Sequence, residues 1–173
     1  ECSEDLSLAD AAASDNCGEV TIEVISETIP GNAAGNYTVV RTFTATDDAG
    51  NSSQAQQTIN VEDTTAPELS IPEDYTSECS IELIFDDATS TDNCGEVTIE
   101  VVSETIPGNA AGNYTVVRTF TATDDAGNSS QAQQTINVVD TTAPEFTSVP
   151  SDYTSECSED LSLADAAASD NCG

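Results

Sequence analysis

The sequence predicts an all-β protein composed of tandem β-sandwich domains. Runs rich in Val, Ile and Thr alternate apolar and polar side chains, and short turns separate them. The chain also repeats itself, because residues 1–18 recur as 156–173, and residues 15–61 recur as 92–138 with a single change. Successive copies are 77 or 78 residues apart, and about seven short strands in a copy of this length are typical of a small β-sandwich.

The central copy shows the expected elements in order. Short strands are expected at 67–71 and 74–78, followed by a brief apolar run at 81–85 and an acidic, polar loop at 86–93. Longer strands are expected at 97–106, which Pro107 ends, at 114–123 and at 131–139. The segment 125–128, Asp-Ala-Gly-Asn, is typical of a tight hairpin turn in which Gly127 supplies the positive φ.

The strand expected at 114–123 has two chemically different faces. One face holds Tyr114, Val116, Arg118, Phe120 and Ala122, and the other holds mainly threonines. A Thr-rich face fits contact with water, so the first face is expected to pack on the core. Arg118, like Arg41 in the first copy, then points toward the core and needs a carboxylate partner, with exposure at the sheet rim as the alternative.

The repeats predict three domains. Residues 1–63 are a repeat without its first strands, residues 64–140 are a complete repeat, and residues 141–173 are the N-terminal part of the next repeat. The joints 63–67 and 140–144 are short and contain Pro, which favours a fixed angle between neighbours. We expect a segment of a longer, continuous array. The alternative is that the tail of one subunit completes the head of the next by strand addition.

The charge is strongly unbalanced. The chain has 33 Asp and Glu residues against two Arg and no Lys or His, which gives a formal net charge of −31. We reject disorder because the acidic residues are dispersed among periodic β-branched runs. Nucleic acid and anionic membranes are poor partners for a polyanion, whereas divalent cations are natural ones. No segment approaches the length of an apolar membrane span, so direct insertion into a membrane is not expected.

Six regularly spaced cysteines predict disulfides and therefore an oxidising compartment. The first interpretation pairs the two cysteines that lie close together in each repeat, as Cys2–Cys17, Cys79–Cys94 and Cys157–Cys172. Each such loop would stabilise the fold by roughly 3 kcal/mol. Two alternatives stay open: free buried thiols, or bonds from Cys17 to Cys79 and from Cys94 to Cys157.

Three stretches together resemble a known family. TDNCG, NYTVVRTFTATDDAGN and VVDTTAPEF are similar to hyalin-repeat-like, immunoglobulin-like domains of bacterial surface and secreted proteins. The resemblance covers the whole chain. It implies tandem immunoglobulin-like sandwiches in an adhesin, stalk or filament, located outside the cell or at its surface, and it implies no single ligand.

Calcium is the cofactor that this acidity favours. Ca²⁺ takes about six to eight oxygen ligands, and acidic joints in similar bacterial adhesins bind it. The alternative is that these side chains only cap their own turns. The candidate ligands are Asp47, Asp48, Asn51, Asp63 and Glu68 in the first copy and Asp124, Asp125, Asn128, Asp140 and Glu145 in the second. Asp92 is a further candidate, although Asp-Asn-Cys-Gly is also a turn sequence.

Sugar attachment is a separate expectation. Thr64 and Thr141 lie in an Asp-Thr-Thr pattern that resembles an O-glycosylation pattern of some bacterial surface proteins. The triplets beginning at Asn36, Asn51, Asn113 and Asn128 fit the N-linked pattern.

The sequence thus predicts a structural segment of an extracellular filament or adhesin stalk, with copies of itself as partners. Catalysis is not expected, because the chain has no His or Lys and its cysteines are expected in bridges. The alternative function is an adhesion module that binds carbohydrate, such as surface glycans, or a protein.

Overall fold

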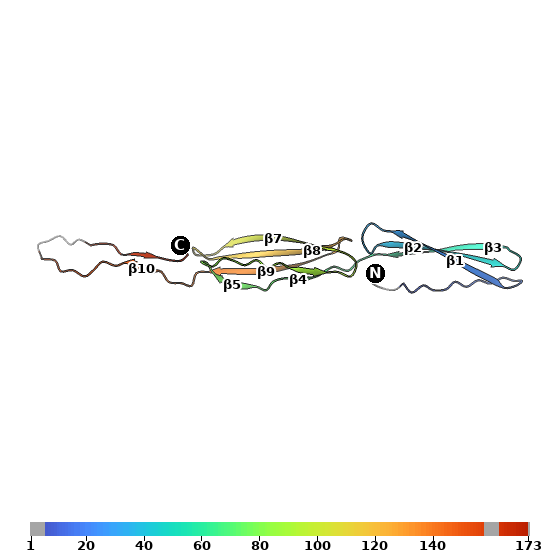
Figure 1. The fold of residues 1–173 in the computed structure, drawn as a ribbon, viewed down its shortest axis with the longest axis horizontal. Coiled ribbons are helices and arrows are strands. Elements are labelled where there is room, and N and C mark those ends of the chain that lie inside the picture. Colours follow the sequence, from blue (N-terminus) through green and yellow to red (C-terminus); the bar gives the residue numbers. More distant parts are fainter. Residues whose placement is uncertain (1–5, 158–162, 173) are drawn as a thin grey trace. The chain divides into compact units, whose positions relative to one another are not determined.

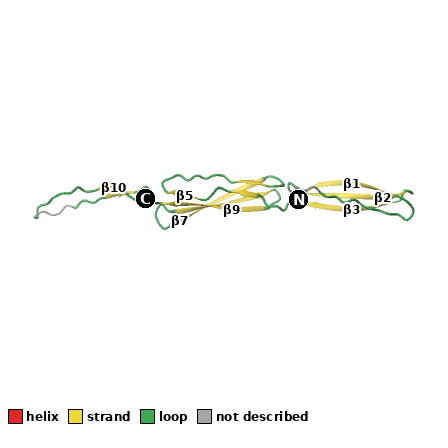
Figure 2. Cartoon of the chain, turned by 90° about the horizontal axis from the view of Figure 1, so that it is seen from below, coloured by secondary structure: helices red, strands yellow, loops and turns green. Residues whose placement is uncertain are grey.

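The computed structural model describes residues 6–157 and 163–172. All regular secondary structure in this part of the chain is β-strand, and Figure 2 draws no helix there. The predicted all-β class is therefore confirmed. The strands are β1 Val20–Pro30, β2 Tyr37–Asp47, β3 Ser52–Val61, β4 Glu68–Ser70, β5 Tyr75–Glu78, β6 Thr89–Thr91, β7 Val97–Pro107, β8 Tyr114–Asp124, β9 Ser129–Val139, β10 Glu145–Ser148 and β11 Ala167–Ser169.

The strands form four sheets (Figure 1). One sheet has the order β1-β2-β3, with antiparallel neighbours. Another has the order β5-β9-β8-β7, in which the short β5 runs parallel to β9. Two small antiparallel pairs, β4 with β6 and β10 with β11, complete the described structure.

Contacts divide the chain into two compact units. The first comprises the described residues of 1–70, 88–100 and 120–132, and the second comprises those of 71–87, 101–119 and 133–173. Strands β7, β8 and β9 contribute residues to both units, so the units do not coincide with the sequence repeats. The domain division at residues 63–64 and 140–141 therefore stays a prediction.

Each long hairpin turns where the sequence predicted it. Gly127 lies between β8 and β9 with a φ of 94°, and its counterpart Gly50 lies between β2 and β3 with a φ of 87°. This left-handed backbone suits glycine, which has no Cβ to clash. The predicted tight turn is therefore confirmed in both copies.

The core of the second unit is small. Val116, Ile136 and Val138 form its centre, and Tyr75 and Leu83 pack against it. Val116 lies on the predicted apolar face of β8, and Phe120 and Ala122 on the same face are fully buried. The predicted alternation of faces is therefore confirmed.

Two local expectations differ from the structure. The apolar run 81–85 is not a strand, although Leu83 from this run still packs on the core. Strand β6 lies inside the expected loop 86–93, where its Ser and Thr residues carry no apolar signal. Pairing with β4 forms β6, and that pairing is a long-range event.

The two arginines are buried, each with 6% of its surface exposed. Arg118 Nη1 donates to the Asp86 carbonyl at 2.9 Å and to Gln134 Oε1 at 3.1 Å. Arg41 Nη1 makes the equivalent bonds to the Ala9 carbonyl and to Gln57 Oε1. Both guanidinium groups also lie over Phe rings. The expectation that they point inward is met, and the acceptors at these contacts are neutral oxygens.

Candidate functional site at the joints

Glu78, the last residue of β5, organises the second joint. Its carboxylate accepts hydrogen bonds from the backbone N–H of Thr141 at 3.0 Å and from the Thr141 hydroxyl at 2.8 Å. The Thr142 hydroxyl donates to the same group at 3.1 Å, and Asn171 Nδ2 donates at 3.4 Å. One carboxylate thus ties the linker to a segment 93 residues further along the chain.

These bonds favour the ionised form of Glu78. Donation from the Thr141 backbone, followed by the Thr141 hydroxyl, lowers the pKa of Glu78 to about 2, although partial desolvation works in the opposite direction. Glu78 therefore stays charged down to strongly acidic pH.

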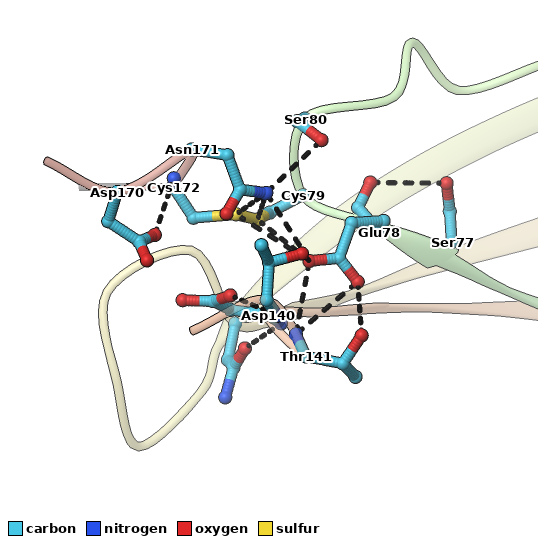
Figure 3. The surroundings of a disulfide bond; sticks show 11 residues. Ser77, Glu78, Cys79, Ser80, Asp140, Thr141, Asp170, Asn171 and Cys172 are labelled. Carbon is cyan, nitrogen blue, oxygen red and sulfur yellow. Dashed lines mark hydrogen bonds between the residues drawn. A yellow bond between two sulfur atoms is a disulfide. The ribbon is translucent and has the colours of Figure 1, made fainter. Parts of the chain in front are cut away.

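A disulfide closes over this carboxylate. Cys79 and Cys172 are bonded across 93 residues of sequence, with their Cα atoms 5.8 Å apart, which is ordinary for a disulfide (Figure 3). Gly112 lies against the bond, since a Cβ there would come within 2.8 Å of the Cys172 Cβ. On the loop-entropy estimate, a loop of this length stabilises the fold by roughly 4–5 kcal/mol.

This bond overturns the predicted cysteine pairing. Cys79 is not bonded to Cys94, and Cys172 is not bonded to Cys157. The alternative pairing of Cys79 with Cys17 is wrong as well. Cys17 and Cys157 are free and exposed, so the predicted bonds Cys2–Cys17 and Cys157–Cys172 are not formed in this chain.

Two further cysteines, Cys94 and Cys2, remain to be placed. Cys94 forms a disulfide, so the alternative of free buried thiols is wrong for it as well as for Cys79 and Cys172. Cys2 lies outside the described residues.

Cys172 reaches Cys79 through contacts of the neighbouring residues. The Cys79 N–H donates to the carbonyl of Val139, the last residue of β9, and Asn171 Nδ2 donates to Glu78 at 3.4 Å. Closeness in sequence does not ensure a bond, because the 15 residues from Cys79 to Cys94 can extend over about 50 Å, whereas a disulfide needs Cα atoms within about 7 Å.

The first joint contains a buried carboxylate. Asp63 is only 6% exposed. Its Oδ1 accepts from the Thr65 N–H at 3.2 Å, and its backbone N–H donates to Asn36 Oδ1 at 2.7 Å. Its other carboxylate oxygen, Oδ2, is buried and has no hydrogen-bond partner. A buried acceptor without a partner is unfavourable unless something else satisfies it.

Asp92, whose carboxylate lies close to that of Asp63, also has such an oxygen. Its Oδ2 accepts from the Cys94 N–H at 2.7 Å, while its Oδ1 is buried without a partner. Ligand atoms of Asp63, Asp92 and Cys94 all lie within 4.8 Å of one another. Because Cys94 is in a disulfide, the two carboxylates are the groups suited to a hard cation such as Ca²⁺.

The equivalent residue at the second joint, Asp140, lies in a related cluster. Ligand atoms of Glu78, Cys79, Asp140 and Cys172 are within 4.8 Å of one another. Asp140 also repeats the backbone pattern of Asp63, since its N–H donates to Asn113 Oδ1 at 2.7 Å and its Oδ1 accepts from Thr142. Both clusters therefore lie at the starts of the predicted linkers.

The hairpin aspartates cap their own turns. Asp47 Oδ1 accepts from the N–H groups of Ala49 and Asn51, and its Oδ2 accepts from Asn51 Nδ2 at 2.8 Å. The Asn51 side chain, followed by the Asn51 backbone, lowers the pKa of Asp47. These bonds agree with the alternative that the turn residues satisfy themselves.

Asp124 makes the same turn in the second copy, with bonds from Gly127 and Asn128. Burial alone would raise the pKa of Asp124, but the hydrogen bonds from Asn128, Gly127 and Ala126 together outweigh it, so the net pKa is lowered. Asn128 Nδ2 also donates to the Asp63 carbonyl at 3.2 Å, which connects this turn to the first joint.

The other candidate ligands do not join these clusters. Glu68 and Glu145 are exposed at the starts of β4 and β10. Asp48 and Asp125 are exposed as well and lie beside Gly18 and Gly95, respectively. Sequence reasoning missed Glu78, although a signal was available: Glu precedes Cys at positions 78 and 156 and at the start of the chain.

The candidate glycosylation residues have structural partners. The Thr141 hydroxyl donates to Glu78, so a sugar on that oxygen would replace this bond. Thr64 is exposed. The amide side chains of Asn36, Asn51, Asn113 and Asn128 are all hydrogen-bonded at the joints or turns. Within the described residues, no helix is both long and apolar enough to cross a membrane.

The chain is similar to one protein family and to two known relatives named hyalin. The chain matches the family described as bacterial Ig-like domain over residues 7–63 and 71–141. It is 31% identical over 183 residues to a hyalin of Lytechinus variegatus, covering 96% of this chain and 34% of the hyalin. It is 35% identical over 155 residues to a hyalin of Strongylocentrotus purpuratus, covering 80% of this chain and 12% of that protein. The chain thus spans about a third or less of these relatives.

A solved structure of the protocadherin gammaB7 EC3-6 cis-dimer also matches 76% of this chain and 45% of that chain. The identity is 14% and the TM-score is 0.36, which is too low to support an argument. The family match and the hyalins confirm the predicted resemblance, the immunoglobulin-like fold and the extracellular or cell-surface location.

Proposed function

Because the chain belongs to the bacterial Ig-like domain family, we propose that it is a structural segment of an extracellular filament or stalk built from copies of this repeat. The observation that supports this function is the disulfide between Cys79 and Cys172, whose sulfur atoms lie within 4.8 Å of a carboxylate oxygen of Asp140, the first residue of the predicted linker. A covalent clamp at a joint suits an element that transmits force. Near-identical copies also suit an array better than a catalyst, which needs one active site.

We further propose that Ca²⁺ binds at the first joint through Asp63 and Asp92. Each carboxylate has one oxygen bonded to the backbone and one buried oxygen without a partner. A cation would satisfy both free oxygens and relieve the repulsion between the two charges. The net charge of −31 adds a general attraction for divalent ions. Asp140 and Glu78 are the corresponding candidates at the second joint.

Thermal melting with Ca²⁺ and with EDTA tests this site. We expect EDTA to lower the melting temperature of the wild-type chain, since an ion at about a hundred times its Kd stabilises by about 2.7 kcal/mol. Asp63→Asn and Asp92→Asn should lose most of this response. Without Ca²⁺, both variants should be as stable as the wild type or more so, because one of two adjacent charges is gone.

Glu104→Gln is the matched control. It removes one negative charge from the exposed face of β7 and should keep the full response to EDTA. An unchanged wild-type melting temperature would exclude a stabilising Ca²⁺ ion. A response that Glu104→Gln reduces equally would indicate general charge screening instead of a site.

The filament role is tested separately by immunogold electron microscopy of the source cells with an antibody against this chain. We expect gold particles to follow extracellular threads or stalks. Label confined to the cell interior, or to dispersed single particles, would contradict the proposed function.

A further inference from the structure

The cysteines fall into two classes by their neighbours. Cys2, Cys79 and Cys157 occur in Glu-Cys-Ser, and Cys17, Cys94 and Cys172 occur in Asn-Cys-Gly. The bond between Cys79 and Cys172 therefore joins a Glu-Cys-Ser cysteine of one repeat to the Asn-Cys-Gly cysteine of the next repeat.

Cys94 is held in the same way as Cys172. The Cys94 N–H donates to Asp92 at 2.7 Å, and the Cys172 N–H donates to Asp170 at 2.9 Å. The asparagine before each cysteine contacts its sulfur. The distance is 2.9 Å from Asn93 Nδ2 to Cys94 Sγ and 3.1 Å from Asn171 Nδ2 to Cys172 Sγ. Cys94 is also disulfide-bonded, and its bond is not with Cys79.

We infer that every joint of the array carries this clamp, and that the clamps together form a covalent load path that prevents the repeats from lengthening under tension. By the repeat, the partner of Cys94 is the Glu-Cys-Ser cysteine of the preceding repeat. The inference rests on the proposed function, because it describes how the array bears force.

The load path follows from the order of the cysteines. Tension enters a repeat through Cys94 and leaves it through Cys79, which precedes Cys94 closely in the sequence. The rest of the repeat lies in loops that the two disulfides bypass. Fully extended, the segment between these two cysteines spans about 50 Å, whereas a whole repeat would span about 270 Å. Unfolding a domain therefore adds little length to the array.

Cys17 and Cys157 fit the same pairing of a Glu-Cys-Ser cysteine with the Asn-Cys-Gly cysteine of the next repeat. Both are free and exposed, and Cys17 already has the turn of its class, with its N–H donating to Asp15 at 3.0 Å. In the array, Cys17 bonds the Glu-Cys-Ser cysteine of a preceding repeat and Cys157 bonds the Asn-Cys-Gly cysteine of a following one. Each pair of thiols passes two electrons and two protons to a disulfide oxidant, such as oxidised glutathione, which leaves as two thiols.

Single-molecule stretching of the full chain, with handles at its two ends, measures the load path directly. The oxidised chain is expected to reach a final length of about 70 Å, because only residues near the ends and between Cys79 and Cys94 are extended. The reduced chain should reach about 600 Å. The expected ratio is therefore about one to nine.

Other disulfide arrangements give different lengths. Local pairing within each repeat would give about 460 Å, and the bond between Cys79 and Cys172 alone would give about 280 Å. Either length in the oxidised wild type would overturn the inference.

The variant Cys172→Ser tests the load path separately. It should lengthen the oxidised chain to about 280 Å, and an unchanged short length of this variant would contradict the load path.

The matched control is the double variant Cys17→Ser, Cys157→Ser, which removes only the exposed free thiols and should leave the short length unchanged. Disulfide mapping by mass spectrometry should also join a peptide containing Cys94 to one containing Cys2. These measurements use the isolated chain and need no filament, so their outcome does not depend on the immunogold experiment.

Discussion

Strands β2 and β8 have the same 11-residue sequence but different burial. In β8, Phe120 and Ala122 are fully buried and Asp124 is 7% exposed, whereas the equivalent residues of β2 are only partly buried. The neighbouring strands differ in the same way, since Gln134 of β9 is 1% exposed and Gln57 of β3 is exposed.

The difference agrees with the contacts that cover β9. Gln134 Nε2 donates to the Glu73 carbonyl at 2.7 Å, and the Thr135 N–H donates to Asp74 at 2.6 Å. Both acceptors belong to the segment that carries β5, which pairs with β9 in the second copy. The alternation therefore defines which face can be buried, and the covering segment decides whether it is buried.

The largest expected contrast is between Phe120→Ala and Phe43→Ala. Removing the fully buried Phe120 ring should destabilise its part of the chain by about 3–5 kcal/mol through lost burial and a residual cavity. Phe43→Ala should lose less than half as much, because its ring is already partly in water. Urea denaturation of both variants measures the difference, and equal losses would mean that the covering segment adds little.

A smaller contrast is expected between Gln134→Leu and Gln57→Leu. The first change removes an acceptor from the buried Arg118 and a donor to the Glu73 carbonyl, which should cost about 2–3 kcal/mol. Gln57→Leu removes the same acceptor from Arg41, but water reaches that exposed position, so the loss should stay below about 1 kcal/mol. A double-mutant cycle with Arg118→Met would show whether Gln134 acts through the arginine.

The smallest contrast is between Glu78 and its equivalent, Glu156. The pKa of Glu78 is lowered from 4.5 to about 2 in the folded chain, so its contribution is present above pH 4.5 and is lost as the pH falls toward 2. We expect the melting temperature of the wild type to drop more steeply across this window than that of Glu78→Gln. Glu156→Gln, at an exposed position, should keep the wild-type slope; identical slopes in all three would show that the bonds to Glu78 are not stabilising.

Local features of the fold were predictable because they depend on neighbours in sequence. The alternation at 114–123 predicted β8 and its buried face, and Gly50 and Gly127 marked the hairpin turns. Strand β6 was not predictable, since Thr89–Thr91 becomes a strand only by pairing with β4.

The candidate site was predicted only in part. The sequence indicated Asp63 and Asp92 separately, but it did not indicate that the two carboxylates lie close together or that each has a buried oxygen without a partner. The pairing of Cys79 was missed because closeness in sequence was taken as closeness in space, whereas Cys79 bonds Cys172, 93 residues further along the chain.

By itself, the sequence determined the all-β class, the repeat, the strand faces, the turns and the acidity that favours cations. These properties follow from side-chain alternation, backbone freedom at glycine and the sum of charges, which need no knowledge of distant contacts. Only the tertiary structure decided which cysteines bond, which of two identical strands is covered, and which aspartates have unsatisfied buried oxygens. Each of these depends on segments far apart in sequence, such as Cys79 and Cys172, reaching the same place.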